Sequence, residues 1–432
     1  MAGFCFIQKL DILGLMLQSK LFPKTLKEAP KDEVSRNAEL LIRAGFINKL
    51  QAGVYTLLPL GLRTVKKITD IVREEMEAIN GQEILMPVLQ PKANWEATGR
   101  WDSLEVLFKF ISPNTKIEMA LGPTHEEVVT PLADRNLSYQ DLPFYLYQIQ
   151  TKFRDEARAK SGMMRGREFG MKDLYSFHVD EADLDAYYEK ATEAYHKVFS
   201  RLGLGDQTFL TFASGGTFSK YSHEFQTLTS AGEDLIHLCR TCKLAVNDEI
   251  FGEQSTCPKC GGALTPEKAA EVGNIFKLKT KYTDAFNLKY KAADGTSKPV
   301  VMGCYGIGIT RLLGVVAETL SDDKGLVWPS NISPFAVHLI SLGAPNEGVN
   351  KMIEEAKSSL ESAGYDVLID DRQDKSAGEK FADADLIGCT IRLVLSERLL
   401  ATQEVEIKLR NQKEAIKVSA GDLVASLRKL GV

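Results

Sequence analysis

A basic stretch in the middle of the sequence contains the residue types that hold phosphate groups. It runs from Phe153-Arg154-Asp155-Glu156 to Arg165-Gly-Arg-Glu-Phe169-Gly-Met-Lys-Asp173, and between Lys152 and Lys172 it holds seven basic and three acidic side chains. Because a guanidinium group matches two phosphate oxygens at once, this excess favours a polyphosphate or a nucleic-acid backbone. Phe169 could stack on a base. The alternative is a solvated hairpin whose charges pair with one another.

Two Cys-x-x-Cys turns predict a metal site. Cys239-x-x-Cys242 and Cys257-Pro-Lys-Cys260 are separated by fourteen residues. Four thiolates at this spacing suit a closed tetrahedral zinc site of structural type, with no ligand position left for catalysis, whereas four free thiols are the alternative. Seven cysteines arranged mainly in this way favour metal binding in a reducing compartment over disulfides, so we expect a cytoplasmic protein.

A short polar segment has both a functional and a structural interpretation. Gly122-Pro-Thr124-His125-Glu126-Glu127 offers hydroxyl, imidazole and carboxylate groups that could grip a small cationic ligand. It is also a good helix start, with Thr124 as the N-cap and Glu127 three residues on, which would leave Glu126 free.

A glycine-rich segment, Gly303-Cys-Tyr-Gly306-Ile-Gly308-Ile-Thr-Arg311, precedes an apolar stretch. It lacks the third glycine of a dinucleotide-binding loop, so by itself it indicates a packing turn between a strand and a helix. Three histidines lie in apolar surroundings typical of core histidines: His178, His223 and His338.

The length and composition describe a globular chain of more than one domain. Its 432 residues are 44% hydrophobic and 26% charged, which excludes fibres, coiled coils and wholesale disorder. The longest apolar run near the start, residues 12–17, is too short to span a membrane. A net charge of -5 means that a nucleic acid would be held by local basic patches. Residues 1–15 contain one Lys and no Arg, which indicates an N-terminal extension rather than a signal or transit peptide.

Hydrophobic periodicity predicts an α+β domain followed by a smaller α/β domain. Helices are expected at 33–51, 65–79 and 184–202, a Gly-rich segment and then a helix at 303–320, a turn at 57–61, and strands at 83–89, 117–121, 144–152, 168–178 and within 273–290. Because these do not alternate regularly, they indicate an antiparallel sheet flanked by helices, over residues 16–328, with a Cys-rich insert at 237–262. From residue 335 to 432, strands at 337–342, 366–369 and 390–395 alternate with helices at 349–363 and 380–387.

The order of these motifs resembles the class II aminoacyl-tRNA synthetases, and closely the bacterial type of prolyl-tRNA synthetase. Phe153-Arg154-x-Glu156 with Arg165-x-x-x-Phe169-x-x-x-Asp173 fits the second motif of the class, and Gly306-x-Gly308-x-x-Arg311 fits the third. Longer strings carry the prolyl resemblance: Gly-Pro-Thr-His-Glu-Glu-Val at 122–128, Tyr-Gln-Ile-Gln-Thr-Lys-Phe-Arg-Asp-Glu at 147–156, Met-Lys-Asp-Leu-Tyr-Ser-Phe-His at 171–178 and Met-Gly-Cys-Tyr-Gly-Ile-Gly at 302–308. The match begins near Met16.

The resemblance implies that the protein joins L-proline to proline tRNA through prolyl-adenylate, using ATP and Mg²⁺, as a homodimer whose interface includes the segment ending at Pro87. It implies a catalytic role for Arg154, Glu156 and Arg311. The implied ATP contacts are Arg154, Glu156, Arg165, Phe169, Asp173, Glu271, Asn274, Gly306, Gly308 and Arg311. The implied proline contacts are Thr124, Glu126, Arg154, His178 and Cys304. The domain from 335 to 432 resembles the family's anticodon-binding domain, with Asp371, Arg372 and Lys380 as candidates for reading bases.

Two departures from the family pattern matter. The family's Glu-Val-Gly-His-Ile-Phe appears here as Glu271-Val-Gly-Asn274-Ile-Phe276, and only about 30 residues, from Asp234 to Glu271, stand where many relatives carry a large editing domain. We therefore expect no editing of mischarged tRNA within this chain. The alternatives are a non-catalytic paralogue that binds RNA or regulates, and a synthetase for another amino acid such as threonine.

Overall fold

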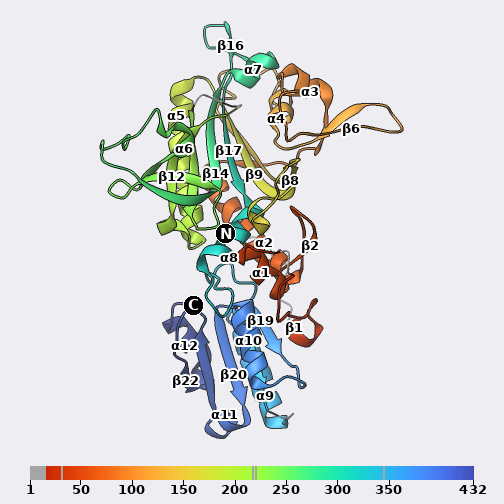
Figure 1. Ribbon diagram of the computed structural model, residues 1–432, viewed down its shortest axis with the longest axis vertical. Helices are drawn as coiled ribbons and strands as arrows, with labels where there is room; N and C mark the ends of the chain where they lie inside the picture. Colours follow the sequence, from red (N-terminus) through yellow and green to blue (C-terminus); the bar gives the residue numbers. More distant parts are fainter. Residues whose placement is uncertain (1–15, 31–32, 217, 219–220, 344–345) are drawn as a thin grey trace, which may run out of the picture.

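The computed structural model describes residues 16–30, 33–216, 218, 221–343 and 346–432 (Figure 1). The expected N-terminal extension, residues 1–15, lies outside the described residues. Two sheets occupy the two ends of the long axis, and helix α8 (Ile309–Leu320) lies between them (Figure 1). No described helix has both the length and the apolar character to cross a membrane.

The larger sheet has nine strands and is mainly antiparallel. In spatial order they are β11 (Tyr221–Leu228), β10 (Thr208–Ser214), β13 (Leu244–Asn247), β12 (Asp234–Cys239), β14 (Thr265–Lys279), β17 (Val301–Gly308), β9 (Glu168–His178), β8 (Phe144–Phe153) and β4 (Gln82–Glu83). The central pairs β14–β17, β17–β9 and β9–β8 are all antiparallel, whereas β4–β8 and β10–β13 are parallel. The antiparallel sheet flanked by helices that the sequence predicts is confirmed.

Alternate residues of the central strands face two different cores. Leu174 and Tyr305 join the cluster under α1 (Arg36–Arg43), α2 (Pro59–Ala78), α5 (Glu181–Arg201) and α8. Their chain neighbours Tyr175 and Cys304 join a second cluster on the other face. Since strand side chains alternate with a period of two, a residue's position in β9 or β17 decides which face it serves.

The second face is covered by smaller elements. These are α3 (Lys92–Ala97), α4 (Glu126–Leu132), α7 (Lys281–Ala285), the sheet β5 (Leu89–Pro91), β7 (Glu118–Leu121) and β6 (Phe108–Ile111), and the hairpin β15 (Lys289–Lys291) and β16 (Ser297–Pro299). Helix α5 on the first face begins at an N-cap, Asp180, whose carboxylate accepts a hydrogen bond from the backbone N–H of Asp183.

The structure corrects the sequence prediction near the N-terminus. The helix expected at 33–51 ends at Arg43, because Gly45 adopts a φ of +76° and turns the chain into a hairpin of β2 (Ile47–Gln51) and β3 (Val54–Leu57). The turn expected at 57–61 is wrong, since Pro59 stands at the first position of α2, where a missing N–H costs nothing. The strand expected at 83–89 is reduced to β4 and β5.

The smaller sheet has six strands in the order β1 (Met16–Leu17), β19 (Val367–Asp370), β18 (Val337–Leu342), β20 (Ile391–Ser396), β21 (Glu404–Leu409) and β22 (Ile416–Ser419). Its helices are α9 (Glu347–Ser362), α10 (Ala377–Ile387), α11 (Glu397–Thr402) and α12 (Leu423–Lys429). All five elements predicted for this part are present, and β18 pairs in parallel with both β19 and β20. The first described strand, β1, extends this sheet from the other end of the chain.

Candidate active site

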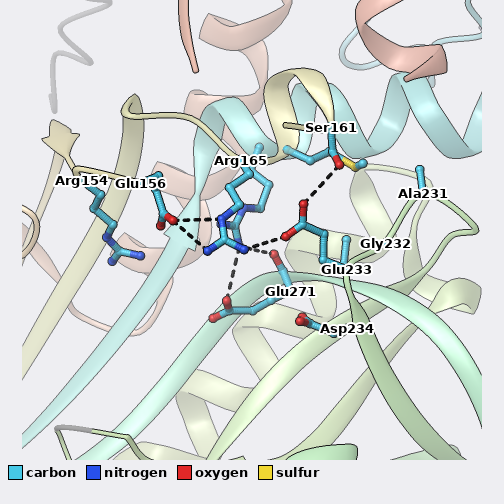
Figure 2. A pocket seen from close by; sticks show the side chains of 12 residues that line it. Arg154, Glu156, Ser161, Arg165, Ala231, Gly232, Glu233, Asp234 and Glu271 are labelled. Atoms are coloured by element: carbon cyan, nitrogen blue, oxygen red, sulfur yellow. Dashed lines mark hydrogen bonds and ion pairs between the residues drawn. The ribbon is translucent and has the colours of Figure 1, made fainter. Parts of the chain in front are cut away.

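A cavity of about 180 Å³ is lined by the loop between β8 and β9, the turn that leads into β12, and residues of β14 and α8. Its walls include three side chains of the basic stretch, Arg154, Glu156 and Arg165, and three from later parts of the chain, Asp234, Glu271 and Arg311. Figure 2 shows Arg165 between Glu156 and Glu233, with Glu271 and Asp234 nearby. The sequence-predicted residues of two separate motifs therefore meet at one cavity.

Arg154 is the cation in this cavity that the fold leaves least compensated. It directly follows β8, and its backbone N–H donates to the carbonyl of Arg167 at 2.9 Å. Its guanidinium carbon lies 5.3 Å from the centroid of the Phe169 ring. Among the described residues, no side chain or carbonyl accepts a hydrogen bond from this guanidinium, and burial together with the charge of Arg311 lowers its pKa. An anion placed here would relieve both effects.

Arg165 is held by two carboxylates. Its Nε and Nη2 donate to Glu156 Oε2 at 3.1 and 2.7 Å, and its Nη1 donates to Glu233 Oε2 at 2.6 Å. Although partial burial opposes the change, the hydrogen bonds that Arg165 donates to these carboxylates raise its pKa. The alternative for these charges was a solvated hairpin in which they pair with one another. Arg165 and Glu156 do pair, but they line a cavity rather than an open surface.

Arg311, on α8, is anchored to β14. Its Nη1 donates to the carbonyl of Glu271 at 2.7 Å and lies 3.3 Å from Glu271 Oε2. The other carboxylate oxygen, Oε1, accepts from Asn274 Nδ2 at 2.7 Å. Asn274 stands opposite Gly306 in the ladder, where a Cβ atom would lie 2.7 Å from the Asn274 Oδ1, so only glycine leaves room for this amide. Asn274 thus orients Glu271 rather than lining the cavity itself.

The second predicted constellation, Thr124, Glu126 and Cys304, is buried on the same face of the sheet. The Thr124 hydroxyl donates to Glu126 Oε2 at 2.5 Å, and the Cys304 thiol donates to Oε1 at 3.1 Å. The capping interpretation is therefore wrong: α4 begins at Glu126 with His125 as its N-cap, Thr124 caps nothing, and Glu126 is not free.

A buried arginine that sequence reasoning missed supports this constellation. Arg100 Nη1 lies 2.9 Å from Glu127 Oε1 and 3.8 Å from Glu126 Oε2. Burial, partly opposed by Arg100, raises the pKa of Glu127 to about 7. Arg100 follows Gly99 in a loop without a motif, so its pairing with Glu127 arises only from the tertiary fold.

The structure does not bring His178 to this pocket. Its position in β9 points it to the α5 face, where Nδ1 lies 2.8 Å from Asp183 Oδ2 and the ring lies beside Tyr145 and Tyr187. His178 is a buried core histidine, which is the structural interpretation of its apolar surroundings.

Asp173 is also misplaced by the sequence prediction. It is almost fully buried, and its Oδ1 lies 2.8 Å from the ammonium of Lys152. Its Oδ2 accepts hydrogen bonds from Gln148 Nε2 and from the hydroxyl of Tyr175. With both oxygens engaged in the interior, Asp173 does not line the cavity that holds Arg154. A charged residue within the aromatic-rich run 144–153, Lys152, was the available signal for this interior pair.

The four predicted zinc ligands come together. The sulfur atoms of Cys239, Cys242, Cys257 and Cys260 all lie within 4.8 Å of one another, with Cys239 and Cys260 at 3.7 Å. Four thiolates at bond lengths of about 2.3 Å around one ion have sulfurs at about this separation. The cluster lies at the end of β12, away from the cavity residues.

The tail residues proposed to read bases are engaged within the tail itself. Lys380 is buried, and its ammonium donates to the carbonyl of Ser341 at 2.7 Å. Arg372 donates to both carboxylate oxygens of Asp370 and to Asp383. Asp371 accepts from the backbone N–H and hydroxyl of Ser19. The polar groups of these three residues are thus engaged within the protein, and their role in reading bases stays a prediction.

Two protein-family models match the chain. The model of the tRNA synthetase class II core domain (G, H, P, S and T) matches residues 108–320. The model of the anticodon binding domain matches residues 336–430.

Curated relatives named proline–tRNA ligase match over almost the whole chain. The protein of Geobacillus sp. (strain WCH70) is 33% identical over 568 residues, covering 96% of this chain and 100% of the relative. That of Oleidesulfovibrio alaskensis is 33% identical over 550 residues, covering 92% and 96%. Both alignments are longer than the 432-residue chain, so these relatives contain residues without a counterpart here.

Solved structures share the fold. The Giardia lamblia prolyl-tRNA synthetase in complex with prolyl-adenylate superposes with a TM-score of 0.76 at 19% identity, covering 89% of this chain and 74% of that one. The Cryptosporidium parvum prolyl-tRNA synthetase with L-proline and AMP gives a TM-score of 0.75 at 18% identity, covering 91% and 74%.

Proposed function

The chain belongs to the proline–tRNA ligase family of class II synthetases, and from this premise we propose how its residues divide the reaction between them. The enzyme activates L-proline with ATP and transfers the prolyl group to tRNA. The observation that carries the assignment of roles is the meeting of Arg154, Glu271 and Arg311, from three separate parts of the chain, at one cavity. The non-catalytic alternative finds no support in the comparisons.

Activation needs no protein nucleophile. A carboxylate oxygen of proline attacks the α-phosphorus of ATP, and the bond from that phosphorus to the oxygen bridging the α- and β-phosphates breaks. Pyrophosphate leaves with that electron pair, and prolyl-adenylate remains. The protein must place the two reactants in line and compensate the charge that develops on the phosphoryl oxygens.

Arg154 is suited to the central role. Its guanidinium has no acceptor among the described residues, so it can donate to the α-phosphate and to the proline carboxylate without first breaking an internal ion pair. The ring of Phe169, whose centroid lies 5.3 Å from the guanidinium carbon, would stack on adenine. Arg311 would hold the γ-phosphate or the other face of the base.

Arg165 and Glu156 act as an exchangeable pair. In the described state their side chains bind each other at 2.7 Å. When ATP binds, the γ-phosphate would replace Glu156 as the acceptor for Arg165. Glu156 could then accept a hydrogen bond from the adenine amine. The 41% exposure of the Arg165 side chain supports such a movement.

Glu271 and Asp234 line the cavity with carboxylate oxygens, the donor type that Mg²⁺ prefers. These residues would hold a magnesium ion against the polyphosphate of ATP, and the ion would neutralise charge on the departing pyrophosphate.

Proline would be bound through its imino group and its ring. Glu126 is a buried carboxylate that can accept from the cationic imino group, with Thr124 beside it. Cys304, whose thiol touches Glu126, would border the ring. The longer relatives contain many residues that have no counterpart in this chain, which supports our expectation that this chain does not hydrolyse mischarged tRNA. Alanine would then be rejected only by its poor fit in the proline pocket.

The proposed zinc site, dimer and location complete the assignment. We propose a structural zinc ion on the four cysteines, whose sulfur separations support tetrahedral binding.

The exposed apolar residues Leu85 and Leu89, beside Pro87, support a homodimer interface there, which light scattering would reveal as a doubled mass. Anticodon contacts would come from the domain after Phe335, and we propose a cytoplasmic location.

Pyrophosphate exchange into ATP tests the function directly. Each amino acid is supplied in turn, and we expect exchange with proline alone. Arg154→Ala should abolish it, whereas Arg398→Ala, at an exposed position on α11, should not. Exchange that is stronger with another amino acid, or that survives Arg154→Ala, would contradict the proposal.

Elemental analysis tests the metal site. Protein purified without chelators should contain about one zinc per chain. Cys257→Ala should lose it, while the matched change at a buried cysteine outside the cluster, Cys389→Ala, should keep it. Protein without zinc would refute this part of the proposal.

A further inference from the structure

Two lysines on neighbouring strands of the catalytic sheet are completely buried, on opposite faces. Lys152, on β8, faces the pocket side, and Lys172, on β9, faces α5. Burying an ammonium is costly unless its charge is compensated. Different groups surround the two ammonium groups, and this difference distinguishes a functional role for Lys152 from a structural role for Lys172.

The ammonium of Lys152 joins two groups. It lies 2.6 Å from His125 Nδ1 and 2.8 Å from Asp173 Oδ1. His125 Nε2 lies 3.1 Å from the carbonyl of Pro87, which can only accept. The Nε2 therefore carries the proton and donates, and Nδ1 accepts from Lys152. Burial and the charge of Lys152 lower the pKa of His125 to about 4, so the ring is neutral in this arrangement.

The same network fixes the backbone of the segment that carries Thr124 and Glu126. The backbone N–H of His125 donates to the hydroxyl of Tyr175 at 3.0 Å, and that hydroxyl donates to Asp173 at 2.9 Å. The hydrogen bond from the Tyr175 hydroxyl is strongest when Asp173 is an anion, a state that the ammonium of Lys152 at 2.8 Å favours. The segment is thus held at His125 by both its ring and its backbone.

The charges of the pocket are balanced by the same lysine. Arg100 pairs with Glu127 at 2.9 Å, and Lys152 pairs with Asp173 at 2.8 Å. Glu126 is then the carboxylate without a close cationic partner, since Arg100 Nη1 lies 3.8 Å from its Oε2. A ligand with one positive charge, such as an imino acid, completes the balance.

We propose that Lys152, acting through His125 and Asp173, is a positioning residue that sets the affinity for proline without contacting it. This inference rests on the proposed function, since it assumes that Thr124 and Glu126 bind the imino group. Lys172 has no such role: its ammonium donates to the Tyr195 hydroxyl and the Tyr305 carbonyl, and none of these groups belongs to the proline-binding segment.

The test is steady-state pyrophosphate exchange on the full-length enzyme. Lys152→Met should raise the KM for proline at least tenfold and change the KM for ATP less than twofold. The matched variant Lys172→Met should leave both KM values within twofold. Equal changes in the two KM values of Lys152→Met, or a rise in the proline KM of Lys172→Met, would overturn the inference.

A double variant separates positioning from charge balance. Lys152→Met with Asp173→Asn removes both charges of the buried pair, so it should fold even where the single variant does not. Because His125 still lacks its donor, the proline KM should stay at least tenfold above wild type. A proline KM restored to the wild-type value would show that the pair is merely structural. The wild-type exchange measured alongside tests the proposed function separately.

Discussion

The catalytic cavity and the smaller sheet treat their arginines in opposite ways. Arg154 has no acceptor for its guanidinium among the residues described, whereas Arg372 is matched by Asp370 and Asp383. Both were candidates for binding an anion or a base when only the sequence was known. The difference teaches that Arg154 can donate to a ligand without losing an internal partner, whereas Arg372 stabilises the fold through its two carboxylate partners.

We expect the largest effect from removing the guanidinium of Arg154, the cation without an acceptor among the described residues. Arg154→Ala should lower the proline-dependent exchange rate at least a thousandfold, about 4 kcal/mol of transition-state stabilisation, because charge on the α-phosphate loses its main partner. The melting temperature should not fall, since no internal ion pair is lost. A variant that keeps a tenth of the wild-type rate would contradict the assignment.

The reciprocal change at Arg372 should affect stability instead. Arg372→Ala leaves the fully buried carboxylate of Asp370 with less compensation, which costs about 3 kcal/mol in comparable buried pairs. Urea unfolding of the full chain should show this loss, and exchange measured at a temperature where the variant is folded should be unchanged. A stable variant with impaired exchange would reverse the roles that we assign to the two arginines.

Lys172 is a third case, an uncompensated cation that faces no ligand. Burial lowers its pKa from 10.5 to about 7, opposed only weakly by Cys304 and Asp173. Between these two pH values the unfolded chain binds a proton that the folded chain does not, so stability rises with pH by about 1.4 kcal/mol per unit.

Urea unfolding at pH 7.5 and pH 9 would measure this dependence. Wild type should gain about 2 kcal/mol from this group over that interval, and Lys172→Met should lose the gain. Other groups titrate in both proteins and cancel in the difference. Equal pH dependence in the two proteins would mean that Lys172 stays charged when buried.

The sequence predicted best those features that depend on local order. The strand 168–178 and the alternating elements after 337 follow from hydrophobic periodicity, and the cysteine spacing predicted the cluster. The matched strings also identified the cavity residues. They failed where residues of one string face opposite sides of the sheet: His178 belongs to the α5 face, whereas Tyr175 and Phe177 of the same string face the other side.

The remaining errors have tertiary causes. The register of β8 against β9 pairs Gln148 with Asp173 and thereby determines that Asp173 contacts Lys152 rather than ATP. Neither strand's sequence alone predicts this register. Lys380 is buried because its ammonium donates to the carbonyl of Ser341 on β18, a contact that only the fold creates, whereas Arg372 pairs with Asp370 just two residues before it. A charged residue in a loop is a stronger ligand candidate when the described part of the protein supplies no acceptor for it, as for Arg154.

The smallest expected effect concerns Asn274, which stands where the family resemblance predicts histidine. Its amide donates to Glu271 Oε1 at 2.7 Å, and an imidazole N–H can make the same bond. Because Gly306 leaves space opposite this position, Asn274→His should fit and change exchange less than threefold, below about 0.7 kcal/mol. Asn274→Leu, similar in size but unable to donate, should release Glu271, weaken its hold on Arg311 and raise the KM for ATP. If the histidine variant were as impaired as the leucine variant, steric space rather than the hydrogen bond would govern this position.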